Sequence, residues 1–406
     1  MERSVEAHLA DVLSGIAPLP PFELGLLDAR GCRLADDVIA PFALPAFSSA
    51  TCEGYAVRVA DCAQASDTRP VQLLVVDAVV PGSRPRLAVV PGAAVRVRLG
   101  SALPEGAEAV IPADEVVLGD DVITVRQAIR QGAHIRRAGV ELARDSVVLE
   151  RGTRIDARRI SLLAAAGVGR VRAHPRPRVV IVTIGDELVE PGAAMLPGTV
   201  SDSNGVMLSA LVQQLGAVAY RVGPIADDAD VLEQVLADQL VRADLVVIAG
   251  GVAATSYETV VEVANRLGSM EIHRVSMMPG AAQGLGQLGD DRIPTLTLPG
   301  YPAAAFVSFE VFVRPVIMRM AGADDVVPNS VRAELLTGIR SGSGRRQYVP
   351  SLRVFGADGV LRVQPLHSEH VTAELAHADC LLVIPEMVEQ ILAGDIVDIY
   401  VLDGAG

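Results

Sequence analysis

The chain has 406 residues and a formal net charge of −14, with 35 basic against 49 acidic residues. This acidic balance argues against nonspecific binding to nucleic acid, whose phosphates attract basic surfaces. No apolar run reaches the roughly 18 residues of a membrane-spanning helix, and the first residues lack the pattern of a signal peptide. We therefore expect a soluble, cytoplasmic protein that does not insert directly into membranes.

The composition limits the kinds of site that the chain can build. Four cysteines are scattered without the paired spacing of a metal site, so we expect reduced, structural thiols. The seven histidines are also scattered, which favours core or surface positions over metal ligation. Every basic residue is an arginine, and no site can therefore use a lysine. Aromatic residues make up only 3%, so the cores must be aliphatic.

The N-terminal part indicates one helix followed by short strands. Ser4 is placed to cap a helix whose apolar face carries Val5, Leu9 and Val12. From about residue 57 to 140, short β-rich segments alternate with Pro, Gly and Asp turns, which is typical of a small β-barrel or sandwich. Because a helical pattern returns at 159–167, this β-rich stretch is predicted to be an inserted domain.

The next region has the pattern of an open α/β sheet. Three apolar runs predict strands buried on both faces, with helical segments between them. The runs lie at 179–182, 244–249 and 294–298. Each run ends in a turn that contains glycine: Gly185, Gly250–Gly251, and Pro299-Gly300-Tyr301-Pro302. Ligands bind outside the carboxyl ends of such strands, so these turns predict a crevice of nucleotide or cofactor size.

Polar groups next to these turns are candidates for chemistry. Asp186 and Glu187 follow the first strand, where carboxylates can hold Mg²⁺ or accept hydrogen bonds from a ligand. A solvated turn is the alternative for this pair. The tripeptide D-S-N at 202–204 precedes a helical pattern at 206–215 and has the composition of its N-cap. The glycine pair would let backbone N–H groups approach a phosphate.

The last eighty or so residues again read as short strands and predict a separate C-terminal β-domain. The fold class that we expect is therefore α/β plus β, with a doubly wound α/β domain, an inserted β-rich domain and a C-terminal β-domain. The expected domains are a discontinuous one at 1–44 and 141–175, the insertion at 45–140, the α/β domain at 176–323 and the β-domain at 324–406.

A set of motifs in a fixed order resembles the molybdopterin molybdenumtransferase family, which includes the MoeA-type proteins and the gephyrin E domain. The motifs are E-G-Y-A-V at 53–57, G-D-E-L at 185–188, D-S-N at 202–204, D-D at 227–228, G-G-V at 250–252, P-G at 279–280 and L-P-G-x-P at 298–302. The resemblance covers essentially the whole chain. It implies a MoeA-like fold and an elongated homodimer formed through the discontinuous domain. Active members bind adenylated molybdopterin, Mg²⁺ and molybdate, insert the metal into the dithiolene and release AMP.

The resemblance also assigns roles to residues, should the chain be active. It implies catalytic roles for Asp186, Glu187 and Asp228, and metal-holding roles for Glu53, Glu141 and Glu258. The residues that it implies for cofactor binding are Asp202, Ser203, Asn204, Gly250, Gly251, Pro279, Gly280, Pro299, Gly300 and Pro302.

Several positions depart from the family's pattern. The family's K-P-G-K is M-P-G-A at 278–281, so two cationic donors for oxyanions are lost. Ala253 and Thr255 replace a serine and a glycine of the phosphate-cradling turn, Tyr301 replaces an asparagine, and three aspartates are glutamates. These losses favour a repurposed scaffold with an eroded site and no cofactor. A divergent but active molybdenumtransferase is the alternative.

The scaffold hypothesis implies a peptide partner. In the gephyrin E domain a partner peptide lies between the first helix and the C-terminal β-domain, and a gephyrin-like bacterial branch is associated with the cell-division protein FtsZ. The matching positions here are Glu6, Leu9, Arg345, Pro385 and Ile391. We therefore expect a short linear peptide of a cytoplasmic partner, such as the FtsZ tail or the cytoplasmic segment of a membrane receptor. The alternative for Leu9 is that it is a core residue on the apolar face of the first helix.

Overall fold

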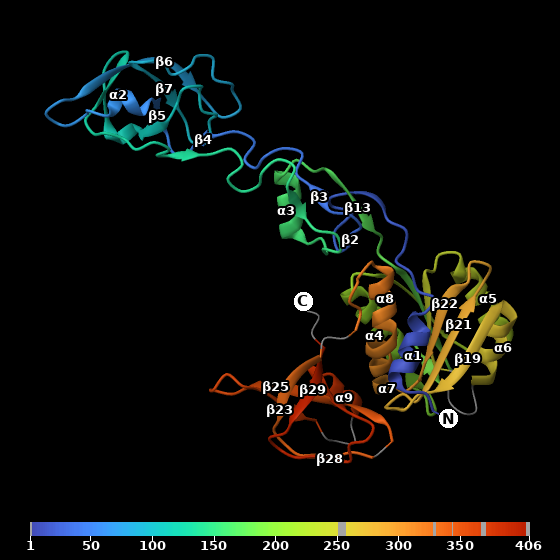
Figure 1. Cartoon of the computed structure of the whole chain (residues 1–406). Helices are drawn as coiled ribbons and strands as arrows, with labels where there is room; N and C mark the ends of the chain where they lie inside the picture. Colours follow the sequence, from blue (N-terminus) through green and yellow to red (C-terminus); the bar gives the residue numbers. More distant parts are fainter. Residues whose placement is uncertain (1, 251–256, 328–329, 343, 367–370, 403–406) are drawn as a thin grey trace. The chain divides into compact units, whose positions relative to one another are not determined.

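The structure, a computed structural model, describes residues 2–250, 257–327, 330–342, 344–366 and 371–402. The chain forms two compact units (Figure 1). The first unit comprises Met1–Glu23, Gly31–Ala35 and Arg172–Gly406, and the second comprises Leu24–Arg30 and Asp36–Val171. None of the helices in these ranges is long and apolar enough to cross a bilayer. The expected division into four domains stays a prediction.

The second unit is built around a six-stranded sheet, which confirms the β-rich character of this region. Its strands follow the order β8-β5-β7-β6-β10-β9. Their bounds are β5 Gly54–Val57, β6 Val71–Val79, β7 Ala93–Val97, β8 Ala109–Pro112, β9 Val116–Leu118 and β10 Val122–Val125. Gly54 lies so close to the carbonyl oxygen of Ile111 on β8 that no side chain fits there. The core is aliphatic, with Leu73 and Ile123 among its fully buried members.

Shorter elements complete the second unit. Helix α3 is capped by the Asp156 carboxylate, which accepts a hydrogen bond from the Arg159 amide at 2.9 Å. The pairs β3–β12 and β4–β11 are two-stranded ribbons. The bounds are β3 Val38–Ile39, β4 Ser49–Ala50, α2 Val59–Cys62, η1 Ala113–Glu115, β11 Ile135–Arg136, β12 Val147–Leu149 and α3 Ala157–Ala165.

The first unit contains the predicted α/β sheet. Its strand order is β17-β14-β18-β22-β21-β19, with the first four strands parallel and the last two antiparallel. The bounds are β14 Arg178–Ile184, β17 Val218–Ile225, β18 Leu245–Ala249, β19 Gly268–Arg274, β21 Ala282–Leu288 and β22 Ile293–Leu298. The three predicted strands are thus confirmed. The β19–β21 hairpin was not predicted, because its polar residues and three glycines break the strand pattern.

Helices cover both faces of this sheet, which explains why its central strands are buried and mainly apolar. Helices α1, α4, α7 and α8 cover one face, with the π-helical turn η2 between the last two, and α5 and α6 cover the other (Figure 1). The bounds are α1 Val5–Leu13, α4 Ser203–Gln214, α5 Ala229–Leu240, α6 Tyr257–Leu267, α7 Pro302–Ser308, η2 Phe309–Val313 and α8 Arg314–Met320. The predicted caps are confirmed, since Ser4 caps α1 and Asp202 caps α4.

The C-terminal part of the first unit is a second six-stranded sheet, as predicted. Its order is β20-β25-β26-β23-β29-β27, and an additional β25–β27 pairing curls it toward closure. The bounds are β20 Met277–Met278, β23 Ser330–Leu335, β25 Arg346–Phe355, β26 Leu361–Pro365, β27 Cys380–Ile384 and β29 Ile396–Val401. The remaining short elements are β1 Phe22–Gly25, β2 Arg33–Leu34, β13 Arg170–His174, β15 Leu188–Val189, β16 Val200–Ser201, β24 Ile339–Arg340, α9 Val371–Leu375 and β28 Gln390–Ile391.

Helix α1 joins the α/β sheet to the C-terminal strands. Its Val5 is buried in a cluster with Phe312 of η2 and Leu381 of β27. Ion pairs surround this contact: Glu2 binds Arg345 at 2.6 Å, Glu6 binds Arg346, and Arg346 binds Glu386 at 3.1 Å. The N-terminal helix is therefore an integral part of this unit and connects two of its sheets.

One residue of α1 is a buried histidine without hydrogen bonds. His8 is fully buried, and neither ring nitrogen has a partner among the described residues. Its ring packs edge-on against Phe312 at 4.8 Å and His273 at 5.7 Å between centroids. The pKa of His8 is lowered from 6.5 to about 4, chiefly by burial and also by His273 and Arg3, against an opposite effect of Asp11. The neutral imidazole acts here as an aromatic core residue.

We predict that His8 makes the protein sensitive to acid. The unfolded chain takes up a proton at this histidine near pH 6.5, whereas the folded protein does so only near pH 4. Stability is therefore lost progressively as pH falls between these values, by up to about 3 kcal/mol. Urea unfolding at pH 7 and at pH 4.5 measures this loss. Between these pH values the free energy of unfolding should fall less for His8→Phe than for the unchanged protein. The exposed His377→Phe serves as the control, and equal pH dependence of both variants would contradict the prediction.

Candidate functional site

A cavity of about 210 Å³ lies at the carboxyl ends of β14, β18 and β22. The three glycine turns predicted from the sequence meet there, through Gly185, Gly250 and Gly300. The other lining residues are Ile184, Asp186, Glu187, Leu188, Asn204, Asp227 and Ala249. All of them belong to the first unit. The parallel sheet therefore gathers residues from five separate stretches of the chain at one edge.

Glycines make the floor of this crevice possible. Gly250 has a φ of +99°, and a side chain there would collide with the carbonyl oxygen of Ile184. A Cβ on Gly300 would lie 3.4 Å from the Cα of Gly250. The two turns are also joined by a hydrogen bond from the Gly250 amide to the Leu298 carbonyl at 3.2 Å. Because no side chains project here, a ligand can approach the backbone closely.

The crevice contains three carboxylates, and one of them differs from the prediction. Asp186 and Glu187 line it as expected, and an oxygen of Asp186 accepts a hydrogen bond from the Asp227 amide at 3.0 Å. Asp228 does not line the cavity. Its carboxylate caps α5 by accepting hydrogen bonds from the Asp230 and Val231 amides at 3.0 Å. Asp227 lines the cavity instead, because the capping hydrogen bonds of Asp228 turn the Asp228 side chain away from the cavity.

Asp202 has a structural position beneath the crevice. Its fully buried carboxylate accepts hydrogen bonds from the Thr183 hydroxyl at 2.8 Å, the Arg221 guanidinium at 2.8 Å and the Gly205 amide at 2.9 Å. Arg221 also binds Glu190 at 2.9 Å. Because it accepts hydrogen bonds from three donors, this carboxylate fixes the start of α4 against β14 and β17. Ser203 is the first residue of that helix.

Two acceptor atoms of the crevice are left without donors. The Asn204 amide nitrogen donates to the Gly300 carbonyl at 2.7 Å, which fixes the orientation of the side chain. Its Oδ1 and the Oδ1 of Asp227 are buried and have no hydrogen-bond partner among the described residues. An unsatisfied buried acceptor costs about 1–3 kcal/mol, so a ligand that offers N–H donors here would relieve that cost.

The turn that contains Pro279 and Gly280 lies outside this crevice. It connects β20 to β21, and Met278 at its start is 56% exposed. Met278 lines a different cavity of about 550 Å³, together with Arg345, Gln347 and two glycines of the β24–β25 connection. Pro302 begins α7, and Tyr301 before it is exposed.

Other predicted residues are distributed more widely. Glu53 and Glu141 belong to the second unit, where they pair with Arg96 at 3.2 Å and with Arg136, respectively. Gly251, Ala253 and Thr255 lie outside the described residues, and for Glu258 only its place in α6 is described. Within the described ranges no three His, Cys, Asp or Glu side chains are grouped to hold a metal ion.

One residue that was predicted to line the peptide groove is buried in the structure. Ile391 is only 8% exposed and packs in the C-terminal core with Ile339, so it cannot form a surface wall. Pro385 is exposed and Leu9 is half-buried against the α1 cluster. Glu6 and Arg345, expected to fix polar ends, are both engaged in ion pairs within the chain.

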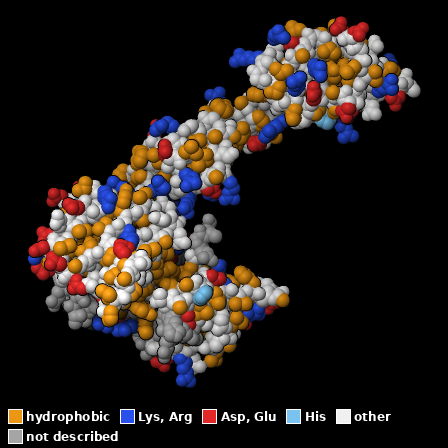
Figure 2. Space-filling view, turned by 180° about the vertical axis from the view of Figure 1, so that it is seen from behind, with side chains coloured by type: hydrophobic (Ala, Val, Ile, Leu, Met, Phe, Trp, Pro, Cys, Tyr) orange, Lys and Arg blue, Asp and Glu red, His pale blue; other side chains and the backbone are white. Residues whose placement is uncertain are grey.

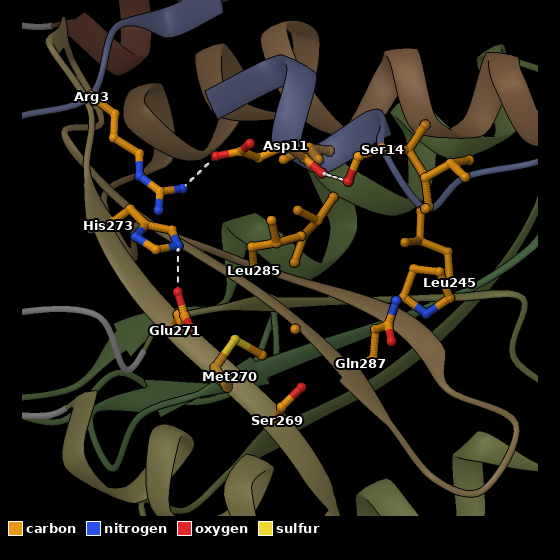
Figure 3. Close-up of a pocket in the computed structure, with 17 residues that line it drawn as sticks. Arg3, Asp11, Ser14, Leu245, Ser269, Met270, Glu271, His273, Leu285 and Gln287 are labelled. Atoms are coloured by element: carbon orange, nitrogen blue, oxygen red, sulfur yellow. Dashed lines mark hydrogen bonds and ion pairs between the residues drawn. The ribbon is translucent and has the colours of Figure 1, made fainter. Parts of the chain in front are cut away.

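A larger cavity of about 430 Å³ lies at the other ends of the parallel strands (Figure 3). Leu245 and Pro294, near the starts of β18 and β22, line it. Polar side chains surround its apolar floor in two pairs: Arg3 with Asp11 at 2.6 Å, and His273 with Glu271 at 3.4 Å (Figure 3). No residue predicted from the sequence lies there. A pattern of single polar residues spread over α1 and the β19–β21 hairpin gives no local signal.

We predict that Asp202 stabilises the site more than Asp228 does. Asp202→Ala removes the α4 cap and leaves the partly buried Arg221 without its main partner, so the free energy of unfolding should fall by roughly 3 kcal/mol. Asp228→Ala removes only an exposed cap and should cost about 1 kcal/mol. Urea unfolding of both variants measures the difference, and equal losses would contradict the prediction.

Comparisons with known proteins agree with this architecture. Three family models match: the MoeA N-terminal region (domain I and II) at residues 3–167, a probable molybdopterin binding domain at 180–319, and the MoeA C-terminal region (domain IV) at 332–402. The chain is 37% identical to molybdopterin molybdenumtransferase 1 of Mycobacterium tuberculosis, covering 98% of this chain and 99% of that protein. It is 35% identical to molybdopterin molybdenumtransferase 2 of the same species, covering 97% and 98%.

The fold is shared with a solved structure over its full length. The crystal structure of the molybdopterin biosynthesis MoeA protein from Pyrococcus horikoshii superposes with a TM-score of 0.85 at 27% identity, and covers 100% of both chains. The MoeA-like multidomain fold inferred from the motifs is thus confirmed. The chain belongs to the molybdopterin molybdenumtransferase family.

Proposed function

We propose that this protein is an active molybdopterin molybdenumtransferase, which takes adenylated molybdopterin and molybdate as substrates, inserts the metal into the dithiolene and releases AMP. We thus favour the divergent but active enzyme over the repurposed, noncatalytic scaffold. Relatives that are named for the activity span the whole chain at 35–37% identity, which supports this order. A cytoplasmic location is part of the same proposal.

The main support for this proposal is a pair of buried oxygen acceptors in the crevice. Asn204 and Asp227 each present a buried oxygen without a donor among the described residues. The edge of a pterin carries an amino group and a ring N–H, which are the donors that such oxygens need. Gly250 and Gly300 leave room for a flat ring close to the backbone. The residues present therefore fit the pterin of the substrate.

Mg²⁺ belongs to the proposed reaction through the family and not through a preformed cage. The crevice offers Asp186 and Glu187 as the carboxylates that would hold it. Two carboxylates are sufficient for this ion, because Mg²⁺ commonly keeps several waters and binds substrate phosphates as well. When bound, the ion would neutralise charge on the two linked phosphates of the adenylated pterin, one of which leaves in AMP.

A cation near Met278 offsets the loss of the family's lysines. Arg345 lines the same cavity as Met278, and its guanidinium supplies fixed N–H donors suited to an oxyanion. Its pairing with Glu2 at 2.6 Å holds it in place. We assign Arg345 to the binding of molybdate or phosphate, in the role that a lysine at 278 or 281 would have.

Complementation tests this proposal directly. Expression of the protein at normal level in a bacterial strain that lacks its molybdenumtransferase should restore molybdoenzyme activity. Arg345→Met should lower the transfer rate of the purified protein about a hundredfold, the usual effect of removing one electrostatic stabiliser. The exposed Arg340→Met is the matched control. If the unchanged, folded protein fails to restore molybdoenzyme activity, the proposed activity is rejected and the scaffold becomes the favoured function.

The peptide-binding scaffold is the second candidate, favoured by the replacement of both lysines by Met278 and Ala281. Its remaining apolar contact residues are Leu9 and Pro385. A homodimer would present two such surfaces, so a filament-forming partner such as FtsZ, or a clustered receptor, would gain avidity. The burial of Ile391 changes the test, because Ile391→Asp would place a charge in the core and unfold the domain.

We predict that Leu9→Ala together with Pro385→Ala weakens capture of the purified protein by an immobilised FtsZ C-terminal tail peptide at least tenfold, since apolar anchors carry most of such binding. The melting temperature should stay within about 3 °C of the unchanged protein. Val241→Ala, at a remote and highly exposed position, is the control. Unchanged capture by the folded double variant would exclude this surface.

A further inference from the structure

The turn at 278–281 is held in place by one buried amide. Gln283 on β21 is only 2% exposed, although glutamine usually lies at the surface. Its Nε2 donates to the Gly280 carbonyl at 2.6 Å and to the hydroxyl oxygen of Ser308 at 2.7 Å. Ser308 is itself fully buried, at the last residue of α7. One nitrogen thus connects the turn, the hairpin strand and the helix.

The turn fits this arrangement only with a glycine. Gly280 has a φ of +96°, and a Cβ there would lie 2.8 Å from the Ser308 hydroxyl oxygen and 3.3 Å from the Gln283 amide nitrogen. The backbone therefore packs directly on the two polar side chains. A second anchor holds the base of the turn, where the Val275 amide donates to the Ala281 carbonyl at 2.7 Å.

Helix α7 connects this anchor to the crevice. Gly300, which lines the crevice, lies just before the first turn of α7, and Ser308 ends the helix. Six residue steps of an α-helix span about 9 Å. The other end of the turn carries Met278, which lines the cavity that contains Arg345. The hydrogen bonds of Gln283 therefore lie between an element that lines the crevice and a turn that lines the Arg345 cavity.

We propose that Gln283 is a positioning residue that aligns the molybdate-binding cavity at Met278 and Arg345 with the pterin crevice. This inference rests on the proposed function. Gln283 touches neither substrate, and it acts through the turn. Its amide suits the task because it donates two hydrogen bonds to oxygen acceptors without carrying charge. A glutamate would face the Gly280 carbonyl with another acceptor, and an apolar side chain would release both partners.

The test uses Gln283→Met, which keeps the length of the side chain and removes its donors. Loss of a hydrogen bond is worth about 1 kcal/mol, so a KM for molybdate raised roughly fivefold is expected as the turn loosens. The Kd for the adenylated pterin should stay unchanged, because the crevice residues are not altered. Gln287→Met, on the same strand, is the matched control. A general folding defect would instead lower activity toward both substrates.

A second readout does not depend on activity. Hydrogen exchange of the Met278, Gly280 and Ala281 amides should speed up in Gln283→Met and in Ser308→Ala. The double variant should add little, since both changes break the same connection. Exchange at 185–188 in the crevice should not change. If the unchanged protein has no transfer activity, the proposed function fails and exchange alone decides. Unchanged exchange, or faster exchange with unaltered KM for molybdate, overturns the positioning role.

Discussion

The crevice depends on the buried carboxylate of Asp202. It is bonded by a hydroxyl from β14, a guanidinium from β17 and an amide from α4, so it fixes three elements relative to one another. Asn204 stands two residues further along the same helix, and its amide can bond the Gly300 carbonyl only while that helix starts where it does. A buried charge is costly unless every oxygen is satisfied, and here the cost is offset by three donors. The function of the site therefore rests on a residue that is hidden beneath it.

The sequence predicted the parts of this arrangement that repeat along a strand or helix. Central parallel strands are buried on both faces and read as apolar runs, so β14, β18 and β22 were found, and caps such as Ser4 and Asp202 carry their own signal. Tertiary contacts carry none. Whether Asp227 or Asp228 faces the crevice depends on which one caps α5, and Ile391 lies in the core because β28 pairs with β24. His8 and Gln283 look like surface residues in the sequence.

Under the proposed function, a lysine-free member of this family has to bind its anionic substrates with arginines. An arginine holds its guanidinium plane rigidly and keeps its charge, but its longer, branched head cannot simply replace an ammonium on the same short turn. Here Arg345, just before β25, lines the same cavity as Met278. Arginine and acidic side chains are interspersed on the face shown in Figure 2, which agrees with the many ion pairs between described residues. Charge in this protein is used in local pairs.

The position of α1 sets the order in which the protein can be completed during synthesis. This helix is synthesised well before its partners: Val5 packs on Leu381, and Glu2 and Glu6 pair with arginines at 345 and 346. Domains generally fold as they emerge, and contacts between distant parts of a chain form late. The part of α1 around Val5 can therefore reach its final packing only after the C-terminal strands have been made, whereas Val12 at the other end of the helix packs on the α/β sheet.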